Sequence, residues 1–450
     1  MSVYDPISYG AQATSDKVDT RPIQAAVDEA HSNGGGTVLF RSGKTYLSGS
    51  IVLKTNVWLH VEAGSILQAS GDWKDITERF PEGWGMLAES GKFLAAHKGT
   101  KNIGITGPGV IDGGGRHYID EDQGQIYKCP NTRPFLLFFV GCEGVTLRDT
   151  TFRDSALWTL RLSGCEDVLI SGIRVRGDLK FPNCDGIDLD RCRRARISDC
   201  DIICGDDGIS LKSCKEFQDL GPCEDIVVSN CTIETRSSAL VVGVDATSPI
   251  RNVTFTNCVV RNSHRGLSVN LGEDSVYENI LFSNCIVETR VFSSQWWGRG
   301  EPIYVSASPW IDKSIGSARN IRFSNILIRS ECGAYLSSDT FGWLSDIVLD
   351  SVRIEISPWS GSTDPRDEGG EYDVRPSSGD RQVYRPEEGI AGFHLENLKG
   401  VKMRNCEVIW KAKAPWYKNA VWAKGCEGLS LGVEVGGEAA EEVLRAIVVA

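Results

Sequence analysis

The sequence lacks the features that mark membrane, nucleic-acid-binding and zinc proteins. No stretch approaches 18 consecutive apolar residues, so a membrane-spanning helix is not expected. Basic residues are in deficit, with 48 Lys and Arg against 60 Asp and Glu, and the net charge of −12 argues against nucleic acid or an anionic membrane as a partner. The six His are scattered, and no Cys/His spacing resembles a zinc site. The sequence thus gives no indication of a zinc site, and we expect no cofactor.

We expect no secretory leader, because the first residues carry neither a basic nor a long apolar segment. The 15 cysteines are odd in number and spread through a large chain, which disfavours a disulfide framework. We expect a soluble, cytoplasmic protein with reduced thiols. A secreted mature form whose leader has been removed would begin in the same way, so that alternative stays open.

What the sequence does have is a short repeated phrase. Each copy alternates apolar and polar residues, as a strand does, and most copies then meet a turn-forming Asn, Asp or Gly. The copies begin at Val145, Val168, Ala195, Ile226, Val253, Ile280, Ile321, Ile347 and Val401. The first six copies start 23, 27, 31, 27 and 27 residues apart. Repetition at such a period indicates a solenoid whose stacked coils share one core.

A second strand precedes several copies at a fixed offset, which favours one winding direction over a stack of antiparallel hairpins or a sandwich. The sequence therefore predicts an all-β, single-domain right-handed parallel β-helix over residues 1–450. Residues 20–33 read as a short N-terminal capping helix, with Thr20 as its cap, Pro22 in its first turn and Gly34 at its end. Cysteines recur at two positions of the repeat and should form buried ladders of thiols.

Two segments interrupt the repeat and are predicted to be loop insertions. Residues 292–310 are rich in aromatic residues, and residues 356–390 are rich in Pro, Gly, Ser and charge. Insertions in solenoids gather on one face, often the binding face. For 356–390 a disordered surface loop is the alternative.

Clustered acids stand at two places one coil apart. Asn183-Cys-Asp185-Gly-Ile and Gly205-Asp206-Asp207-Gly-Ile align through Gly-Ile pairs that lie 22 residues apart. Because neighbouring parallel strands are about 4.8 Å apart, three carboxylates should converge, and at least one should hold its proton. A protonated and an ionised carboxyl side by side suit glycoside hydrolysis. Clustered acids also suit a Ca²⁺ site, which remains the alternative.

These two motifs resemble the N-T-D and G-D-D motifs of glycoside hydrolase family 28, the polygalacturonase family with a pectin-lyase-type β-helix. The opening Tyr9-Gly-Ala and Gly34-Gly-Gly-Thr segments resemble the N-terminus of that family. The resemblance implies metal-independent hydrolysis with inversion. It also implies that Asp206 is the general acid and that Asp185 and Asp207 activate the water.

The chain departs from the family at two motifs that help to hold a galacturonate carboxylate. The G-H-G motif is replaced by Ser237-Ser-Ala239 and the R-I-K motif by Ser268-Val-Asn270. Cleavage of polygalacturonic acid is therefore in doubt. Arg265 falls in the same row as the acids and could replace the missing cation, or it could be a solvated strand-edge residue.

Further residues are candidates for substrate binding. Trp158 lies one coil before Asp185 and could stack on a sugar or belong to the core. A loop insertion holds Trp296, Trp297 and Glu301, which could wall one end of a cleft. The complete set of substrate-binding candidates is Trp158, Asn183, Lys212, Arg265, Trp296, Trp297 and Glu301.

The expected function is glycoside hydrolysis of a pectin-type or related polysaccharide or oligosaccharide. Rhamnogalacturonan-derived oligosaccharides and exo action fit the departures and the loop insertion. Three alternatives stay open: a polysaccharide lyase, an anhydro-forming glycan transferase on the same scaffold, and a non-catalytic carbohydrate-binding β-helix. The sequence gives no indication of the oligomeric state.

Overall fold

The computed structural model describes residues 2–81, 88–310, 315–365 and 389–450. The chain divides into two compact units. Unit 1 comprises Met1–Asp206 and Asp219–Gly221, and unit 2 comprises Asp207–Gln218 and Pro222–Ala450. The single domain expected over residues 1–450 stays a prediction. Within the described ranges, no helix combines the length and the apolar character that crossing a membrane requires.

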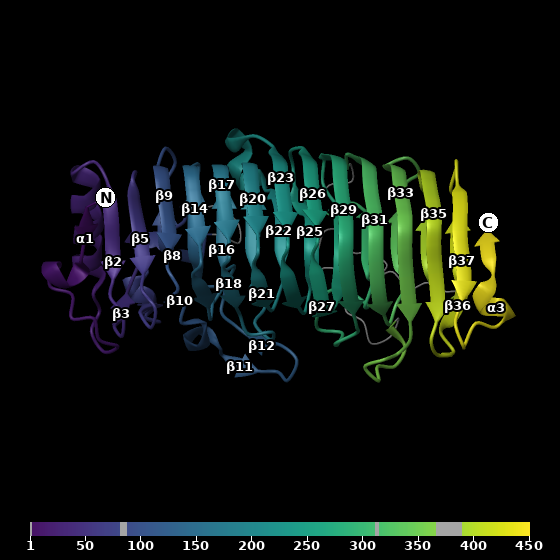
Figure 1. Cartoon of the computed structure of the whole chain (residues 1–450), viewed down its shortest axis with the longest axis horizontal. Coiled ribbons are helices and arrows are strands. Elements are labelled where there is room, and N and C mark those ends of the chain that lie inside the picture. Colours follow the sequence, from purple (N-terminus) through teal and green to yellow (C-terminus); the bar gives the residue numbers. More distant parts are fainter. Residues whose placement is uncertain (1, 82–87, 311–314, 366–388) are drawn as a thin grey trace. The chain divides into compact units, whose positions relative to one another are not determined.

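Unit 1 consists of three parallel ladders of short strands, purple to blue in Figure 1. The first ladder is β1 (Val3–Tyr4), β2 (Gly36–Phe40), β5 (Val57–Val61), β9 (Lys101–Thr106), β14 (Glu143–Arg148), β17 (Glu166–Ser171) and β20 (Arg193–Ser198). The second is β3 (Thr45–Ser48), β6 (Ile66–Ala69), β10 (Val110–Asp112), β15 (Thr151–Arg153), β18 (Arg174–Arg176) and β21 (Asp201–Cys204). The third is β4 (Ile51–Val52), β8 (Gly91–Ala96), β13 (Pro134–Val140), β16 (Leu160–Ser163) and β19 (Ile187–Asp190).

Unit 2 repeats this arrangement, from teal to yellow in Figure 1. Its longest strands form the ladder β23 (Cys223–Ser229), β26 (Ile250–Thr256), β29 (Val276–Thr289), β31 (Ser317–Ser330), β33 (Leu344–Ile356), β35 (Lys399–Trp410) and β37 (Ser430–Gly436). Shorter strands β24 (Thr232–Thr235) and β27 (Val259–Ser263) pair and join β29. The remaining ladder is β22 (Ile209–Ser213), β25 (Ser238–Ala246), β28 (Arg265–Leu271), β30 (Ile303–Ala307), β32 (Ala334–Ser338), β34 (Ile390–Glu396), β36 (Tyr417–Lys424) and β38 (Ile447–Val449).

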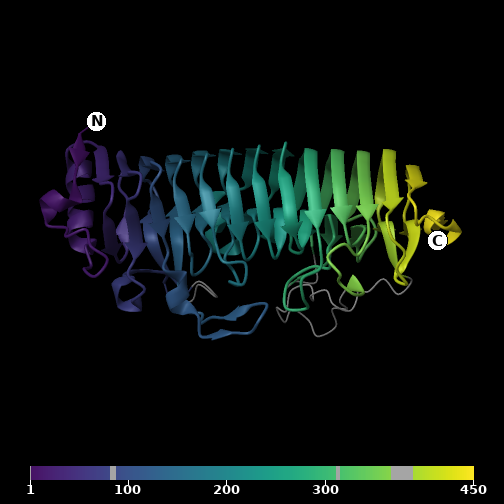
Figure 2. The same ribbon diagram turned by 60° about the horizontal axis from the view of Figure 1, so that its bottom comes forward.

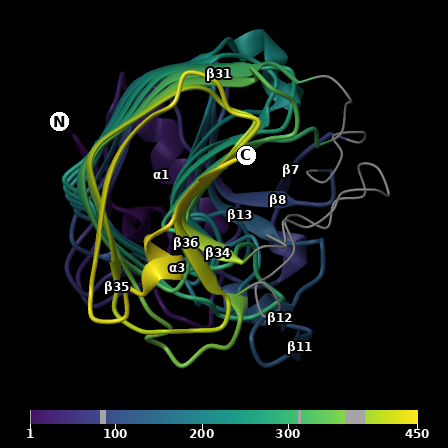
Figure 3. The ribbon, with the colours of Figure 1, turned by 90° about the vertical axis from the view of Figure 1, so that its right-hand side faces the viewer.

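Parallel strands that recur in one order form a parallel β-helix, and crossovers between parallel strands are almost always right-handed. The predicted fold class is therefore confirmed. Several small elements lie outside the parallel ladders, among them β7 (Glu78–Arg79), which pairs antiparallel with β8. In unit 1, the hairpin of β11 (Glu121–Asp122) and β12 (Tyr127–Lys128) projects from the strands (Figure 2). In unit 2, helix α3 (Glu442–Arg445) packs beside β36 (Figure 3).

The repeated phrase sets the register of the coils. Val145 pairs with Val168 and Val168 with Ala195 in unit 1. In unit 2, equivalent first residues pair from coil to coil along the series Ile226, Val253, Ile280, Ile321, Ile347 and Val401. The predicted turn residues adopt the left-handed conformation that Asn and Asp tolerate, with φ of 58° at Asp199 and 57° at Asn230. Turn chemistry and strand pattern thus agree at these coils.

Equal positions of successive coils stack inside each unit. In unit 2, Phe282 stacks on Phe255 with ring centroids 4.8 Å apart and lies 5.1 Å from Phe323. The thiol ladders are also confirmed: Cys142 and Cys165 are buried in unit 1, and three further ladder thiols are buried in unit 2, namely Cys231, Cys258 and Cys285. Cys426, expected at a ladder position, is only half-buried.

Helix α1 (Thr20–Ser32) covers the first strands of unit 1 and buries Ile23, Ala26, Val27 and Ala30. The predicted capping helix is confirmed, but the predicted cap is wrong. Thr20 is the first helical residue, and its hydroxyl accepts the Gly49 N–H at 2.7 Å. Asp19 occupies the cap position, and its carboxylate instead accepts the N–H groups of the preceding loop.

The first insertion is shorter than predicted. Residues 303–307 belong to β30, because Ile303-Tyr-Val-Ser-Ala alternates and pairs with β28. A fully buried Glu331 holds both insertions of unit 2: its carboxylate accepts the N–H of Val291 at 2.9 Å and the N–H of Ser360 at 2.6 Å. Most of the second predicted insertion, residues 366–388, lies outside the described residues.

We expect the ladder thiols to be reduced and unreactive in the native protein. All 15 cysteines are free and 13 are buried, and burial raises the pKa of the ladder thiol Cys406. Because the thiolate is the reactive form, a thiol reagent should label few groups, chiefly half-buried Cys129 and Cys426. After denaturation without reductant, the count should approach 15. Finding most thiols already oxidised would contradict both the ladders and the expected cytoplasmic location.

Candidate active site

Two sharp bends place the candidate acids just before strands β19 and β22. Gly205 and Gly208 flank Asp206 and Asp207 on either side, and neither glycine position has room for a side chain. A Cβ on Gly205 would lie 2.1 Å from the Phe181 carbonyl oxygen, and one on Gly208 would lie 2.5 Å from the Ala239 carbonyl oxygen. The glycines therefore allow the backbone to pass close to its neighbours where the acids begin.

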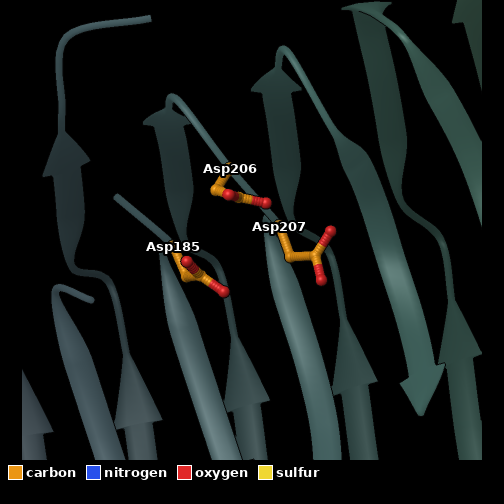
Figure 4. Close-up of side chains that lie close together, drawn as sticks. All are labelled: Asp185, Asp206 and Asp207. Atoms are coloured by element: carbon orange, nitrogen blue, oxygen red, sulfur yellow. The ribbon is translucent and has the colours of Figure 1, made fainter. Parts of the chain in front are cut away.

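The three carboxylates converge as predicted. One oxygen from each of Asp185, Asp206 and Asp207 lies within 4.8 Å of the others (Figure 4). Asp185 and Asp206 are 3% and 5% exposed, and Asp207 is half-buried. Like charges at this distance oppose one another's ionisation, and burial strengthens the effect. The cluster can therefore hold a proton on one carboxyl beside an ionised neighbour.

Within unit 1, a backbone N–H holds Asp206. Its Oδ2 accepts the N–H of Asn183 at 3.1 Å. Asn183 has a left-handed backbone with φ of 55°, and its side-chain Oδ1 accepts a hydrogen bond from Arg133 at 2.9 Å. This predicted substrate-binding side chain thus contributes to the arrangement of the acids.

Sequence reasoning missed Arg133, which is 6% exposed and lies close to the cluster. Besides Asn183, its guanidinium binds the carbonyl oxygens of Ala156 at 3.0 Å and Pro182 at 2.9 Å. Burial lowers the pKa of Arg133, and charge on nearby Asp206 acts in the opposite direction. The coil register could have identified Arg133. Leu137 pairs with Leu160 and Leu160 pairs with Ile187. Arg133 stands four residues before Leu137 and Asn183 stands four residues before Ile187, so the two share a row.

Within unit 2, two serines hold Asp207. The Ser237 hydroxyl donates to Asp207 Oδ1 at 2.8 Å, and the Ser238 N–H lies 3.3 Å from the same oxygen. These serines stand where the resembled family has Gly-His-Gly. The departure from that motif therefore supplies a hydroxyl donor to one of the acids.

Arg265 lies in the row of Asp207 and Ser238, as the register predicted. It is not a solvated edge residue, because it is only 4% exposed. Its Nε is 3.1 Å from Oε2 of fully buried Glu301, and its guanidinium carbon lies 3.8 Å from the centre of the Tyr304 ring. Burial raises the pKa of Glu301, but the charge of Arg265, its hydrogen bond and the backbone hydrogen bonds together outweigh burial, and the pKa is lowered overall. The arginine is thus present as a charge-compensated, fixed group.

The other predicted substrate-binding residues differ in exposure. Lys212 is buried, with its Nζ 3.5 Å from Asp245. Trp158 is half-buried, and the Arg161 guanidinium carbon lies 4.5 Å from the centre of its ring. Trp297 is also half-buried. Trp296 is fully buried, so in this conformation its ring packs the loop and offers no face to a sugar.

The three aspartates are also the residues that could hold a divalent cation. Ca²⁺ takes six to eight oxygen ligands, so three carboxylates would need several further oxygens. Oxygens of Asp206 and Asp207 already accept hydrogen bonds from backbone N–H groups or a hydroxyl. The arrangement suits proton transfer without requiring a metal, and chelation separates the two uses.

Comparisons with known proteins point to one family. The sequence profile of the glycosyl hydrolases family 28 matches residues 87–290. The chain is 28% identical over 257 residues to a probable polygalacturonase of Vitis vinifera, a match that covers 54% of this chain and 52% of that protein. It is 28% identical over 204 residues to an exopolygalacturonase of Cochliobolus carbonum, covering 44% and 43%. The chain spans about half the length of the curated relatives it matches.

Two solved structures share the fold. An exopolygalacturonase from Thermotoga maritima matches with a TM-score of 0.66 at 22% identity, covering 79% of this chain and 88% of that one. A family 28 exopolygalacturonase from Yersinia enterocolitica matches with a TM-score of 0.70 at 16% identity, covering 98% and 79%. At these identities the likeness concerns the β-helix alone.

We expect His264, which directly precedes Arg265, to make the protein sensitive to acid. The imidazole is fully buried, and burial lowers its pKa to about 3 from an ordinary 6.5. As the pH falls below 6.5, His264 binds a proton in the unfolded chain but stays neutral in the folded protein, so the free energy of unfolding decreases. At pH 5, the loss should be on the order of 2 kcal/mol of unfolding free energy.

Denaturant unfolding at pH 7 and pH 5 measures this loss. The drop in midpoint should shrink in His264→Asn, whatever the absolute stability of that variant. His31→Asn, on the exposed end of α1, is the matched control and should leave the drop unchanged. Equal drops in His264→Asn and the wild type would contradict the prediction.

Proposed function

We propose that this chain, which belongs to glycoside hydrolase family 28, hydrolyses glycosidic bonds of a pectin-type polysaccharide or oligosaccharide. The observation that carries the proposal is the cluster of Asp185, Asp206 and Asp207, with one oxygen of each within 4.8 Å of the others. Glycoside hydrolysis needs a carboxylic acid for the leaving oxygen and a carboxylate for the opposite face of the sugar. A module that only binds sugars has no need to crowd three acids together.

The proposed roles follow the resemblance. Asp206 donates its proton to the glycosidic oxygen as the bond from the anomeric carbon to that oxygen breaks. Asp185 and Asp207 take a proton from water, whose oxygen forms the new bond to the anomeric carbon. Asp206 ends ionised and the base ends protonated, and exchange with solvent restores both. The Ser237 hydroxyl fixes Asp207 for this task.

For the substrate, we propose a sugar without a bare carboxylate at the Arg265 position. Ser238, Ser268 and Asn270 stand where the family has His, Arg and Lys, and all three are buried. The two cations that remain nearby in unit 2 are each paired with an acid: Arg265 with Glu301 and Lys212 with Asp245. A compensated cation attracts a second carboxylate weakly. Polygalacturonic acid should therefore be a poor substrate.

Rhamnogalacturonan-derived oligosaccharides are the substrate class we propose, with release from chain ends. Support for exo action comes from the insertion after β29, which is anchored at both ends. The Gly300 carbonyl oxygen accepts the Thr289 hydroxyl at 2.8 Å, and Glu331 holds Val291. A fixed loop next to Arg265 can block one end of a cleft. Small products from the first minutes of a digest are the signature of this mode.

We expect Asp206→Asn to abolish turnover and leave the fold intact. The amide keeps the shape of the side chain but has no acidic proton to donate. The rate on an oligosaccharide should fall by about 10²–10⁴-fold. The measurement is the initial rate on defined pectic oligosaccharides, with circular dichroism as the check on folding. Retention of more than a tenth of the wild-type rate would remove Asp206 from the role of acid.

The lyase and calcium alternatives are separated in the same assay. Hydrolysis should survive exhaustive chelation and yield no product with the absorbance of an unsaturated uronide. Activity that EDTA removes and Ca²⁺ restores, together with such a product, would place the protein among the lyases. A fragment that is one water lighter than the hydrolysis product and lacks that absorbance would indicate the anhydro-forming transferase.

We expect hydrolysis to proceed with inversion. Inverting and retaining enzymes both use a pair of carboxyls, so this expectation rests on the resemblance to glycoside hydrolase family 28. The closest oxygens are within 4.8 Å, below the roughly 6.5–9.5 Å separation of typical inverting pairs, so the test must be chemical. Proton NMR of the earliest product should show the anomer opposite to the substrate linkage, followed by mutarotation. Retention of the anomeric configuration would instead indicate that one aspartate acts as a covalent nucleophile.

We expect Glu301→Gln to shift specificity toward galacturonate. The amide leaves Arg265 with an uncompensated charge in the same place. A charged hydrogen bond to a carboxylate contributes roughly 1.5–3 kcal/mol, so the ratio of specificity constants for oligogalacturonate over a neutral oligosaccharide should rise about 10-fold. The double variant Glu301→Gln with Arg265→Met should lose the gain. A ratio above one in the wild type would contradict the proposed substrate.

A further inference from the structure

Arg133 is a buried cation that binds no carboxylate in the hydrogen bonds described above. It is 6% exposed, and its three acceptors are the carbonyl oxygens of Ala156 and Pro182 and the side-chain oxygen of Asn183. Burying a guanidinium is costly unless its donors are satisfied. The acceptors come from two separate segments of unit 1, so the side chain ties both segments together.

Two of these contacts bear on a single peptide group. The Pro182 carbonyl and the Asn183 N–H belong to the same planar unit, and in a trans peptide they point in opposite directions. Nη1 of Arg133 binds the carbonyl oxygen at 2.9 Å, while the N–H donates to Asp206 Oδ2 at 3.1 Å. Holding the oxygen fixes the plane and therefore the direction of the N–H.

The conformation of Asn183 makes this support necessary. Its φ of 55° lies in the left-handed region, which is less favourable than the extended or helical regions for a residue with a side chain. The bond from Arg133 Nη2 to Asn183 Oδ1 at 2.9 Å holds the side chain of the same residue. One guanidinium thus fixes both the Pro182 carbonyl and the Asn183 side chain.

We propose that Arg133 is a positioning residue that aims the Pro182–Asn183 peptide at Asp206 and thereby orients the general acid toward the leaving oxygen. The proposal rests on the function proposed above, because it assumes that Asp206 delivers a proton. Arg133 itself touches no reacting atom. Its loss should let Asp206 turn away from the leaving group, while Asp207 keeps its hydrogen bonds from Ser237 and Ser238.

If Asp206 is misdirected, the rate should fall more on a substrate with a poor leaving group than on one with a good leaving group. Loss of stability alone would lower both rates equally. Sugar leaving groups need protonation, whereas an acidic phenol leaves without it. Arg133→Met should therefore lower kcat roughly 10–100-fold on an oligosaccharide, a part of the 10²–10⁴-fold that general acid catalysis supplies. On a dinitrophenyl glycoside of the released sugar, kcat should change less than about 3-fold. KM should be similar for both substrates.

Two further variants complete the experiment. Arg133→Lys keeps the charge but cannot reach all three acceptors, so it should show the same selectivity with a smaller loss. Arg191→Met removes another fully buried arginine of unit 1, which binds the Gly221 carbonyl oxygen, and any loss it causes should be equal on the two substrates. Rates are expressed per folded protein, measured by circular dichroism.

The outcomes separate the two proposals. Loss on the oligosaccharide with the phenyl glycoside spared supports the positioning role. Equal loss on both substrates in Arg133→Met and Arg133→Lys, per folded protein, overturns it and leaves Arg133 as a structural residue. Failure of the wild type to hydrolyse either substrate overturns the proposed function instead.

Discussion

The pairing register of the parallel coils is the constraint on which the rest of this structure depends. Adjacent backbones lie about 4.8 Å apart, so a residue type repeated at one position of the coil becomes a row of side chains in space. The phenylalanine stack, the thiol ladders and the left-handed turns all follow from this rule. A shift of one residue would turn each row to the other face of its strand.

The same pairing register also brings the three acids together. Asp185 lies just before β19 and the Asp206–Asp207 pair lies just before β22, where glycines let the backbone bend. Rigid supports then hold the acids: a peptide N–H fixed by Arg133 for Asp206, and the Ser237 hydroxyl for Asp207. Crowded carboxylates would repel and reorient in a flexible loop. The hydrogen bonds to Asp206 and Asp207 oppose that reorientation.

Charge compensation distinguishes this chain from the pattern of its family. Where the family places cations to receive a carboxylate, the chain has small polar residues, and the arginine that remains is buried against Glu301. A free cation and an ion-paired cation occupy similar space but differ in how strongly they attract a carboxylate. The fold and the acids are thus retained while the electrostatics of the binding surface differ.

The sequence by itself determined the repeat, the coil register, the thiol ladders and the convergence of the three acids. All of these depend on spacing along the chain, which strand pairing converts directly into position. Only the tertiary structure decided that Arg265 is paired with Glu301, that Trp296 is buried and that Arg133 supports Asn183. These contacts join a coil to an insertion or to a residue two coils away. The register places Arg133 in the row of Asn183, but whether such residues touch depends on how loops and long side chains pack, which spacing does not determine.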